Sequence, residues 1–296
     1  MQKDRTEKYL EAYPDVFADI VNVLLFKEPL IKAEELRDGP TEAVYKAEKG
    51  ETVLEQRRDI AKYVVKDGRE CALIGLENQT NPDGDMVFRM MNYDSASYQS
   101  QIRCGVHRYP VISAVLYFGE KPWGKRRRMN DSYTHAVQCQ GELLPDYKMH
   151  LIEVCSIPKE TREKLTSDFR VVADFFSNRK QKKYIPDNRI LQHPEAVLHL
   201  IAVFAGDERY HEIEAEVAAC CRKGESFSMC EFAERMERQG INKGISQGIS
   251  IGRKQGIEEK MRTVVKNMIQ RGIEDSDICA IAGCNQEFVD SIRKRM

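Results

Sequence analysis

The sequence predicts an α/β core followed by an all-helical C-terminal part. Two apolar stretches surround Asp67-Gly68 in "RRDIAKYVVKDGRECALIGLENQT", residues 57–80, which is typical of a β-hairpin. Residues 109–119, "YPVISAVLYFG", form a nearly continuous apolar run that favours a central strand covered on both faces. From about residue 156 the apolar spacing is helical almost to the end. This order indicates a mixed sheet flanked by helices, with a helical extension.

The individual elements follow from apolar periodicity and from breaker residues. We expect a helix at 6–27 and a loop or short helix from there to about residue 50. The hairpin ends at the breaker cluster 81–85, and a second helix is expected at 85–104. The remaining expected elements are a strand at 150–155 and helices at 158–178, 193–205 and 207–221.

Composition limits the classes of protein that this chain can represent. Its 296 residues, 42% hydrophobic and 31% charged, suffice for one large domain with additions or for two domains. The formal net charge is -1, so binding to nucleic acid must come from local patches. The sequence has no run of 18 apolar residues, so no membrane-spanning helix is predicted. Nine cysteines without a CxxC pair indicate reduced thiols, and we therefore expect a cytoplasmic protein.

Two acids in the hairpin, Asp59 and Glu77, lie nine residues before and after Gly68. A turn with an odd number of residues places them on one face, and a three-residue turn with glycine in the left-handed conformation is common. Two carboxylates pressed together repel unless a proton or cation lies between them, and Mg²⁺ favours such oxygen ligands. The alternative is that the acids face solvent or pair with Arg57 or Arg58.

Gln79 lies two residues after Glu77 and therefore projects on the same face of the strand. An acid, then Glu-x-Gln, then a helix resembles the recombination-promoting nuclease (Rpn) branch of the PD-(D/E)XK nuclease superfamily, also labelled putative transposases. The matching residues are Arg57 or Arg58 with Asp59, Glu77-Asn78-Gln79, then Arg89, Tyr93, Asp94 and Tyr98, with Asp19 and Asn22 in "FADIVNVLLF". "VLYFGEKPWGK" and the glycine-repeat tail are similar too.

The resemblance implies a PD-(D/E)XK nuclease-like core and a DNA endonuclease that depends on Mg²⁺ or Mn²⁺, promoting recombination or acting in defence. Asp59 and Glu77 would hold the metal ion, with the backbone carbonyl of Asn78 as a further ligand. Gln79 stands where the superfamily has a lysine, and it can orient water without supplying positive charge. Two alternatives remain open: a nuclease fold with weak or lost chemistry that serves binding or assembly, and a transposase that joins strands.

Several further residues have two interpretations each. Asp19 would add a carboxylate to the site or pair elsewhere, and Arg89 would touch phosphate or form a salt bridge. Tyr93 would take part in the chemistry or pack in the core. The basic cluster that follows Trp123 would bind DNA or form a solvated loop; its residues are Lys125, Arg126, Arg127 and Arg128.

The C-terminal tail has glycine at every fourth position from Gly240 to Gly256. Glycine weakens a helix by about 1 kcal/mol relative to alanine, so close packing must offset five of them. We therefore expect a helix that crosses a second copy in a homodimer or higher homo-oligomer; the alternative is a flexible spacer. The last 25 residues are expected to form two short helices, with Ser276 and Asn285 as N-caps and Gly283 as a helix stop. They would bind DNA through residues 293–295 or serve packing.

Four segments follow from these patterns. They are a nuclease-like core at 1–155, a helical extension at 156–235, a glycine-repeat helix at 236–271 and a small helical element at 272–296.

Overall fold

The computed structural model describes most of the chain, in two compact units, Met1–Ala233 and Glu234–Met296. The described residues are 9–45, 54–124, 126–133, 146–180, 188–205, 209–223 and 226–295. No helix among them is both long and apolar enough to cross a bilayer.

A five-stranded mixed sheet, in the order β1-β4-β5-β6-β7, forms the centre of the first unit. The first three strands pair antiparallel, while β5, β6 and β7 run parallel. The strands are β1 (Leu36–Asp38), β4 (Ile60–Lys66), β5 (Arg69–Gln79), β6 (Val111–Tyr117) and β7 (His150–Glu153). The sequence prediction of a central covered strand is confirmed, because Ala114, Val115 and Leu116 are fully buried.

The expected loop or short helix before residue 50 is wrong in part, because this region contains two strands. β1 pairs with β4 at the sheet edge, and β2 (Glu42–Tyr45) pairs with β3 (Leu54–Arg57) in a separate antiparallel sheet. β1 and β2 are both short, and neither contains a long apolar run. Pairing with distant strands decides their conformation, and a local pattern does not reveal it.

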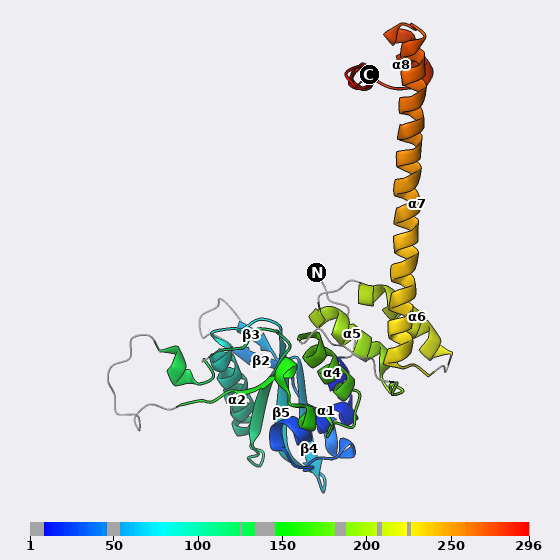
Figure 1. Ribbon diagram of the computed structural model, residues 1–296. Helices are drawn as coiled ribbons and strands as arrows, with labels where there is room; N and C mark the ends of the chain where they lie inside the picture. Colours follow the sequence, from blue (N-terminus) through cyan, green and yellow to red (C-terminus); the bar gives the residue numbers. More distant parts are fainter. Residues whose placement is uncertain are drawn as a thin grey trace. The chain divides into compact units, whose positions relative to one another are not determined.

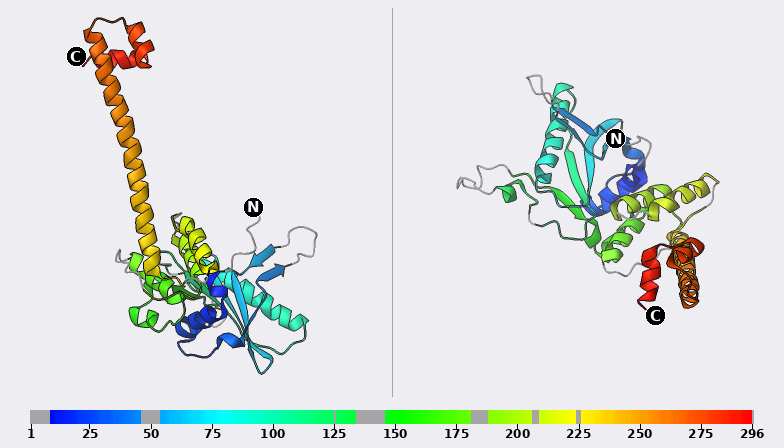
Figure 2. Two further views of the ribbon diagram at one scale, coloured as in Figure 1. Left: turned by 90° about the vertical axis from the view of Figure 1, so that its right-hand side faces the viewer. Right: turned by 90° about the horizontal axis from the view of Figure 1, so that it is seen from above.

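Helices cover both faces of the sheet. α2 (Met86–Arg103) forms the crossover from β5 to β6 and lies on one face, while α1 (Pro14–Ile20) and α4 (Phe169–Lys180) lie on the other (Figure 1). The same two-sided arrangement is seen from above (Figure 2). α1 continues as a π-helix, Val21–Phe26, which ends at Lys27 in the left-handed conformation. The other helices of this unit are α3 (Lys159–Arg162), α5 (Pro194–Ala205) and α6 (Arg209–Arg222).

The hairpin between β4 and β5 reaches its register in an unexpected way. Its turn has two residues, Asp67 and Gly68, both with positive φ (50° and 73°), so the predicted three-residue turn is wrong. A β-bulge then adds one residue, Cys71, between the pairs Val65↔Glu70 and Val64↔Ala72. The bulge restores the odd count, and the ladder ends at Ile60↔Leu76 with Asp59 and Glu77 next in register.

The C-terminal unit consists of α7 (Met229–Gln270) from Glu234 onward, with α8 (Asp275–Ala282) and α9 (Gln286–Arg293). Their shared core is Val265, Ile278, Val289 and Ile292. The glycine repeat lies within α7, which confirms that it is helical.

Two of the three predicted end signals in this unit are also confirmed. Asn285 caps α9 by accepting the Phe288 amide, and Gly283 ends α8 at φ 65°. Ser276 is not an N-cap, because α8 begins earlier, at Asp275 after Glu274.

Candidate active site

The open end of the β4–β5 hairpin brings the predicted carboxylates together. β4 begins at Ile60, but β5 continues past its partner Leu76 to Gln79. The amide of Asn78 therefore has no partner on β4, and it donates to Asp59 Oδ2 at 2.8 Å. The carboxyl ends of β5, β6 and β7 lie at this same edge, which is where open α/β sheets commonly bind ligands.

Glu77 is a buried carboxylate with an incomplete set of partners. Its side chain is 5% exposed, and Oε1 accepts hydrogen bonds from Arg89 at 2.6 Å and Gln79 at 3.4 Å. Oε2 is buried and has no hydrogen-bond partner in the described part of the chain. Burial raises the pKa of Glu77 to about 7, the negative charge of Asp59 adds to this rise, and Arg89 opposes it.

Glu11 joins this group, although no sequence argument indicated it. It lies in a short 3-10 helix, Leu10–Ala12, and is fully buried. Neither carboxylate oxygen has a hydrogen-bond partner among the described residues. Burial raises the pKa of Glu11 to about 7, and the charge of Asp59 contributes to the rise. The available signal was an acid beside Leu10 in the turn before Pro14, but no spacing connects it to the hairpin.

Arg89, on α2, connects two acids at the site. Its guanidinium contacts Glu77 at 2.6 Å and Asp83 at 3.2 Å, and it donates to the Tyr93 hydroxyl at 3.4 Å. A salt bridge is therefore present, and a phosphate contact stays a prediction. Tyr93 is otherwise packed in the core between α2 and β6.

The residue before Asp59 is held by a buried polar network. Arg58 Nη2 lies 3.2 Å from Asp94 Oδ1, which also accepts from Ser113 at 2.6 Å. Tyr147 donates to the other oxygen of Asp94 at 2.6 Å. The Arg58 side chain runs across Gly75, where a Cβ would come within 2.9 Å of Arg58 Cδ. The network fixes the chain beside Asp59 to α2, so Arg58 pairs with Asp94.

Asp19 lies away from the carboxylate group. It accepts the backbone amides of Thr166 at 2.9 Å and Ser167 at 2.8 Å, just before α4. This is the second interpretation given above, in which Asp19 pairs elsewhere.

The basic cluster separates into residues with different partners. Arg127 contacts Glu153 at 2.8 Å and Arg128 contacts Asp146 at 3.3 Å. Arg126 is exposed, lies against Gly84 and has no carboxylate partner among the described residues. Lys125 lies outside the described residues.

The chemistry of the donors fits a hard divalent cation. In the described part of the chain, no group of three or more His, Cys, Asp or Glu side chains converges as a complete metal site. The two hairpin acids and the carbonyl of Asn78 would instead form a partial set that leaves positions for water, as Mg²⁺ prefers. The unpartnered buried oxygens of Glu77 and Glu11 support this fit, because buried carboxylates need a proton or a positive charge.

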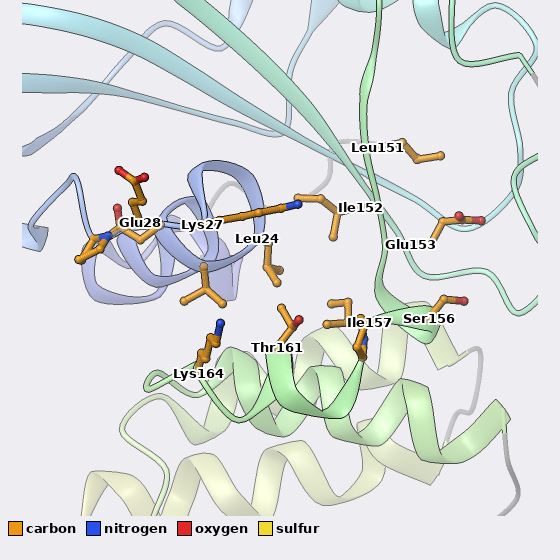
Figure 3. Close-up of a pocket in the computed structure, with 14 residues that line it drawn as sticks. Leu24, Lys27, Glu28, Leu151, Ile152, Glu153, Ser156, Ile157, Thr161 and Lys164 are labelled. Atoms are coloured by element: carbon orange, nitrogen blue, oxygen red, sulfur yellow. The ribbon is translucent and has the colours of Figure 1, made fainter.

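A separate cavity of 590 Å³ lies between the π-helix, β7 and the segment that contains α3 (Figure 3). Leu24 and Thr161 point toward one another across it. Its lining includes neither Asp59 nor Glu77, so it is distinct from the carboxylate group.

The fold and the carboxylate group define an α/β protein with an acidic site at the open end of a hairpin. Residues 64–204 match the family model described as putative transposase, YhgA-like. This part of the chain is therefore similar to the Rpn/YhgA family, as the sequence resemblance indicated. The match includes Glu77, Gln79 and Arg89 and begins after Asp59. No curated protein and no solved structure matches the chain at a significant level.

Proposed function

We propose that the protein is a metal-dependent DNA endonuclease with a PD-(D/E)XK-type core. The observation that carries the proposal is the register of the hairpin, which puts Asp59 next in line opposite Glu77 at the end of β5. The match of residues 64–204 to a transposase family model supports DNA as the substrate. The strand order, with a hairpin followed by a helix and a parallel strand, is consistent with such a core.

Each residue then has a stated role. Asp59, Glu77 and the Asn78 carbonyl would hold Mg²⁺ or Mn²⁺, which when bound polarises the scissile phosphate and lowers the pKa of a water molecule. Gln79, next to the Glu77 carboxylate, would orient the attacking water by hydrogen bonds. Arg89 would exchange its contact with Glu77 for one with a phosphate oxygen.

The test is cleavage of supercoiled plasmid with Mg²⁺ or Mn²⁺, with EDTA as the control. Glu77→Gln is expected to lower the rate about a hundredfold or more, because it removes a charged metal ligand while preserving shape. Glu70→Gln is the matched control. Glu70 is an acid on the same strand, but it lies at the far end of the hairpin, where it pairs with Arg37. Equal rates for the wild type and Glu77→Gln would refute the proposal.

Two observations favour a second candidate, a nuclease fold that binds DNA without cutting it. Gln79 brings no positive charge, and Arg89 neutralises Glu77 where a cation would lie. In that case the folded wild-type protein binds DNA but shows no metal-dependent nicking at any concentration.

A further inference from the structure

We propose that the C-terminal unit carries a second site, which binds the phosphate backbone of DNA in a groove between α7 and α9. The proposal rests on the proposed function only for the identity of the polyanion. We call this feature the α7–α9 groove. Its lining residues are Arg262, Thr263, Lys266, Asn267, Gln270, Ile292 and Arg295.

The side chains that line the α7–α9 groove are suited to binding an anion. The groove has a volume of 570 Å³ and contains three cationic side chains, two amides and a hydroxyl, with no acid among its lining residues. Proteins contact DNA phosphates and sugars with these same side-chain types. A neutral or cationic partner would leave Lys266 and Arg295 without counter-charge, whereas a phosphodiester chain supplies it.

One of the cations is held in place before any ligand binds. Arg262 contacts Glu258 at 2.7 Å, and its guanidinium lies over the Phe288 ring at 5.3 Å. Phe288 packs against the core of the unit, so the groove wall is connected to that core. A positioned cation loses little conformational entropy on binding.

The other two cations are available. Lys266 and Arg295 have no carboxylate partner in the described part of the chain. Arg293, which the sequence also suggested as a DNA contact, is instead neutralised by Asp275 at 2.5 Å. The structure thus distinguishes two neighbouring arginines on the same terminal segment.

The framework around the groove resembles a known way of presenting a helix to DNA. α8 and α9 are joined by residues 283–285, a three-residue connection that begins with glycine, as in helix-turn-helix units. The groove offers cations and no set of groups arranged to read base edges. Binding is therefore expected to be independent of sequence and strongly dependent on salt.

The experiment measures binding of the full-length chain to a fluorescent duplex by anisotropy, in EDTA and over a range of salt concentrations. The groove variant carries Lys266→Ala with Arg295→Ala. Loss of two phosphate contacts is expected to reduce the slope of log affinity against log salt by about 2 and to weaken binding at low salt. The control carries Arg253→Ala with Lys254→Ala, which removes equal charge from exposed positions of α7 outside the groove.

Each outcome decides the proposal. A reduced slope in the groove variant alone supports it, provided that Lys266→Arg with Arg295→Lys binds as the wild type does. Equal losses in both variants would show a general charge effect, and an unchanged groove variant would show no contact, so either result overturns the site. The same groove variant is also measured with an RNA duplex. If it loses binding to RNA but binds DNA as the wild type does, the proposal of a DNA site is overturned. Plasmid cleavage is scored separately, so a nuclease without the groove contact and a groove without nuclease activity give different results.

Discussion

Asp59 accepts the amide of Asn78 at 2.8 Å, immediately beyond the last residue pair of the β4–β5 ladder. The carboxylate replaces the strand partner that Asn78 would otherwise need. Asp59 therefore has a structural contact in addition to the charge that the proposed chemistry requires, and substitutions can separate these two contributions.

Asp59→Asn is expected to abolish cleavage while retaining stability, because its amide oxygen can still accept the Asn78 N–H. Asp59→Ala is expected to abolish cleavage and also lower the free energy of unfolding by about 1–3 kcal/mol, since it leaves a backbone donor unpaired. Urea unfolding and plasmid nicking measure the two effects. Substantial cleavage by Asp59→Asn would exclude the charge of Asp59 from the chemistry.

Stability without metal is expected to fall as pH rises. The pKa values of Glu11 and Glu77 are raised from 4.5 to about 7 by burial and by Asp59. The folded protein therefore holds protons that the unfolded chain has lost, and this stabilisation, complete below about pH 4.5, disappears as pH passes 7.

Glu11→Gln provides the matched comparison for this pH effect. In EDTA it should have the same melting temperature as the wild type at pH 5 and a higher one at pH 8, because it cannot ionise. Addition of Mg²⁺ at pH 8 should stabilise the wild type more than the variant. Identical pH profiles of the two proteins would contradict the assignment of Glu11 to the carboxylate group.

The Arg58–Asp94 network is expected to contribute strongly to folding. Asp94→Ala leaves the buried guanidinium of Arg58 without its counter-charge and should cost about 3–5 kcal/mol in the free energy of unfolding. Tyr147→Phe removes one hydrogen bond to a charged group and should cost about 1.5–3 kcal/mol. Chemical denaturation measures both, and a smaller loss for Asp94→Ala than for Tyr147→Phe would contradict this ranking.

Within the basic cluster, Arg126 is expected to be the residue that binds DNA. It lies against Gly84, next to Asp83, which is itself in contact with Arg89 at 3.2 Å. Arg126→Ala should raise the DNA concentration needed for half-maximal cleavage, because one phosphate contact is lost. Arg128→Ala is the control, since its charge is already paired with Asp146. Equal effects of the two substitutions would contradict the prediction that Arg126, and not Arg128, binds DNA.

The glycine repeat of α7 is expected to join two copies of the chain. A Cβ added at Gly244, Gly248 or Gly252 would meet no atom within 4 Å. The neighbouring isoleucines at 241, 245 and 249 are more than half exposed. The repeat thus offers small and apolar groups along a helix of 42 residues, and the described chain leaves these glycines uncovered.

Replacement of these three glycines by leucine should lower the mass measured by light scattering, because bulk prevents close approach of two helices. The control replaces Ser246, Ser250 and Lys254 by leucine, on a different side of the same helix. A monomeric wild type at tens of micromolar, or an unchanged mass of the glycine variant, would leave the repeat as a spacer.

Long periodic segments were predictable from the sequence, and contacts between distant segments were not. The helix at 86–103 and the buried strand at 111–117 follow from apolar spacing over many residues. β1 and β2 owe their conformation to strand partners rather than to their own composition. The glycine stop and the asparagine cap at 283 and 285 are local signals and were correct, whereas Ser276 showed that one suitable residue type does not fix a helix start.

The candidate site shows the same division. Glu77 and Gln79 were recognisable because their spacing on one strand is local information. Glu11 was missed because its relation to Asp59 exists only in the folded chain, where Glu11 is buried within the electrostatic reach of Asp59. Asp19 and Glu11 are only eight residues apart, but the first pairs with Thr166 and Ser167 while the second lies near the hairpin acids.

The bulge at Cys71 absorbs the one residue by which the β5 side of the hairpin is longer than the β4 side. Deletion of this exposed residue would leave the turn intact and would make the ladder regular, with Ala72 still opposite Val64 and Glu77 still next in register with Asp59. Insertion of one further residue into β5 without a second bulge would instead turn Glu77 to the opposite face of the sheet. Homologues are therefore expected to have either the bulge together with its extra residue or neither of them.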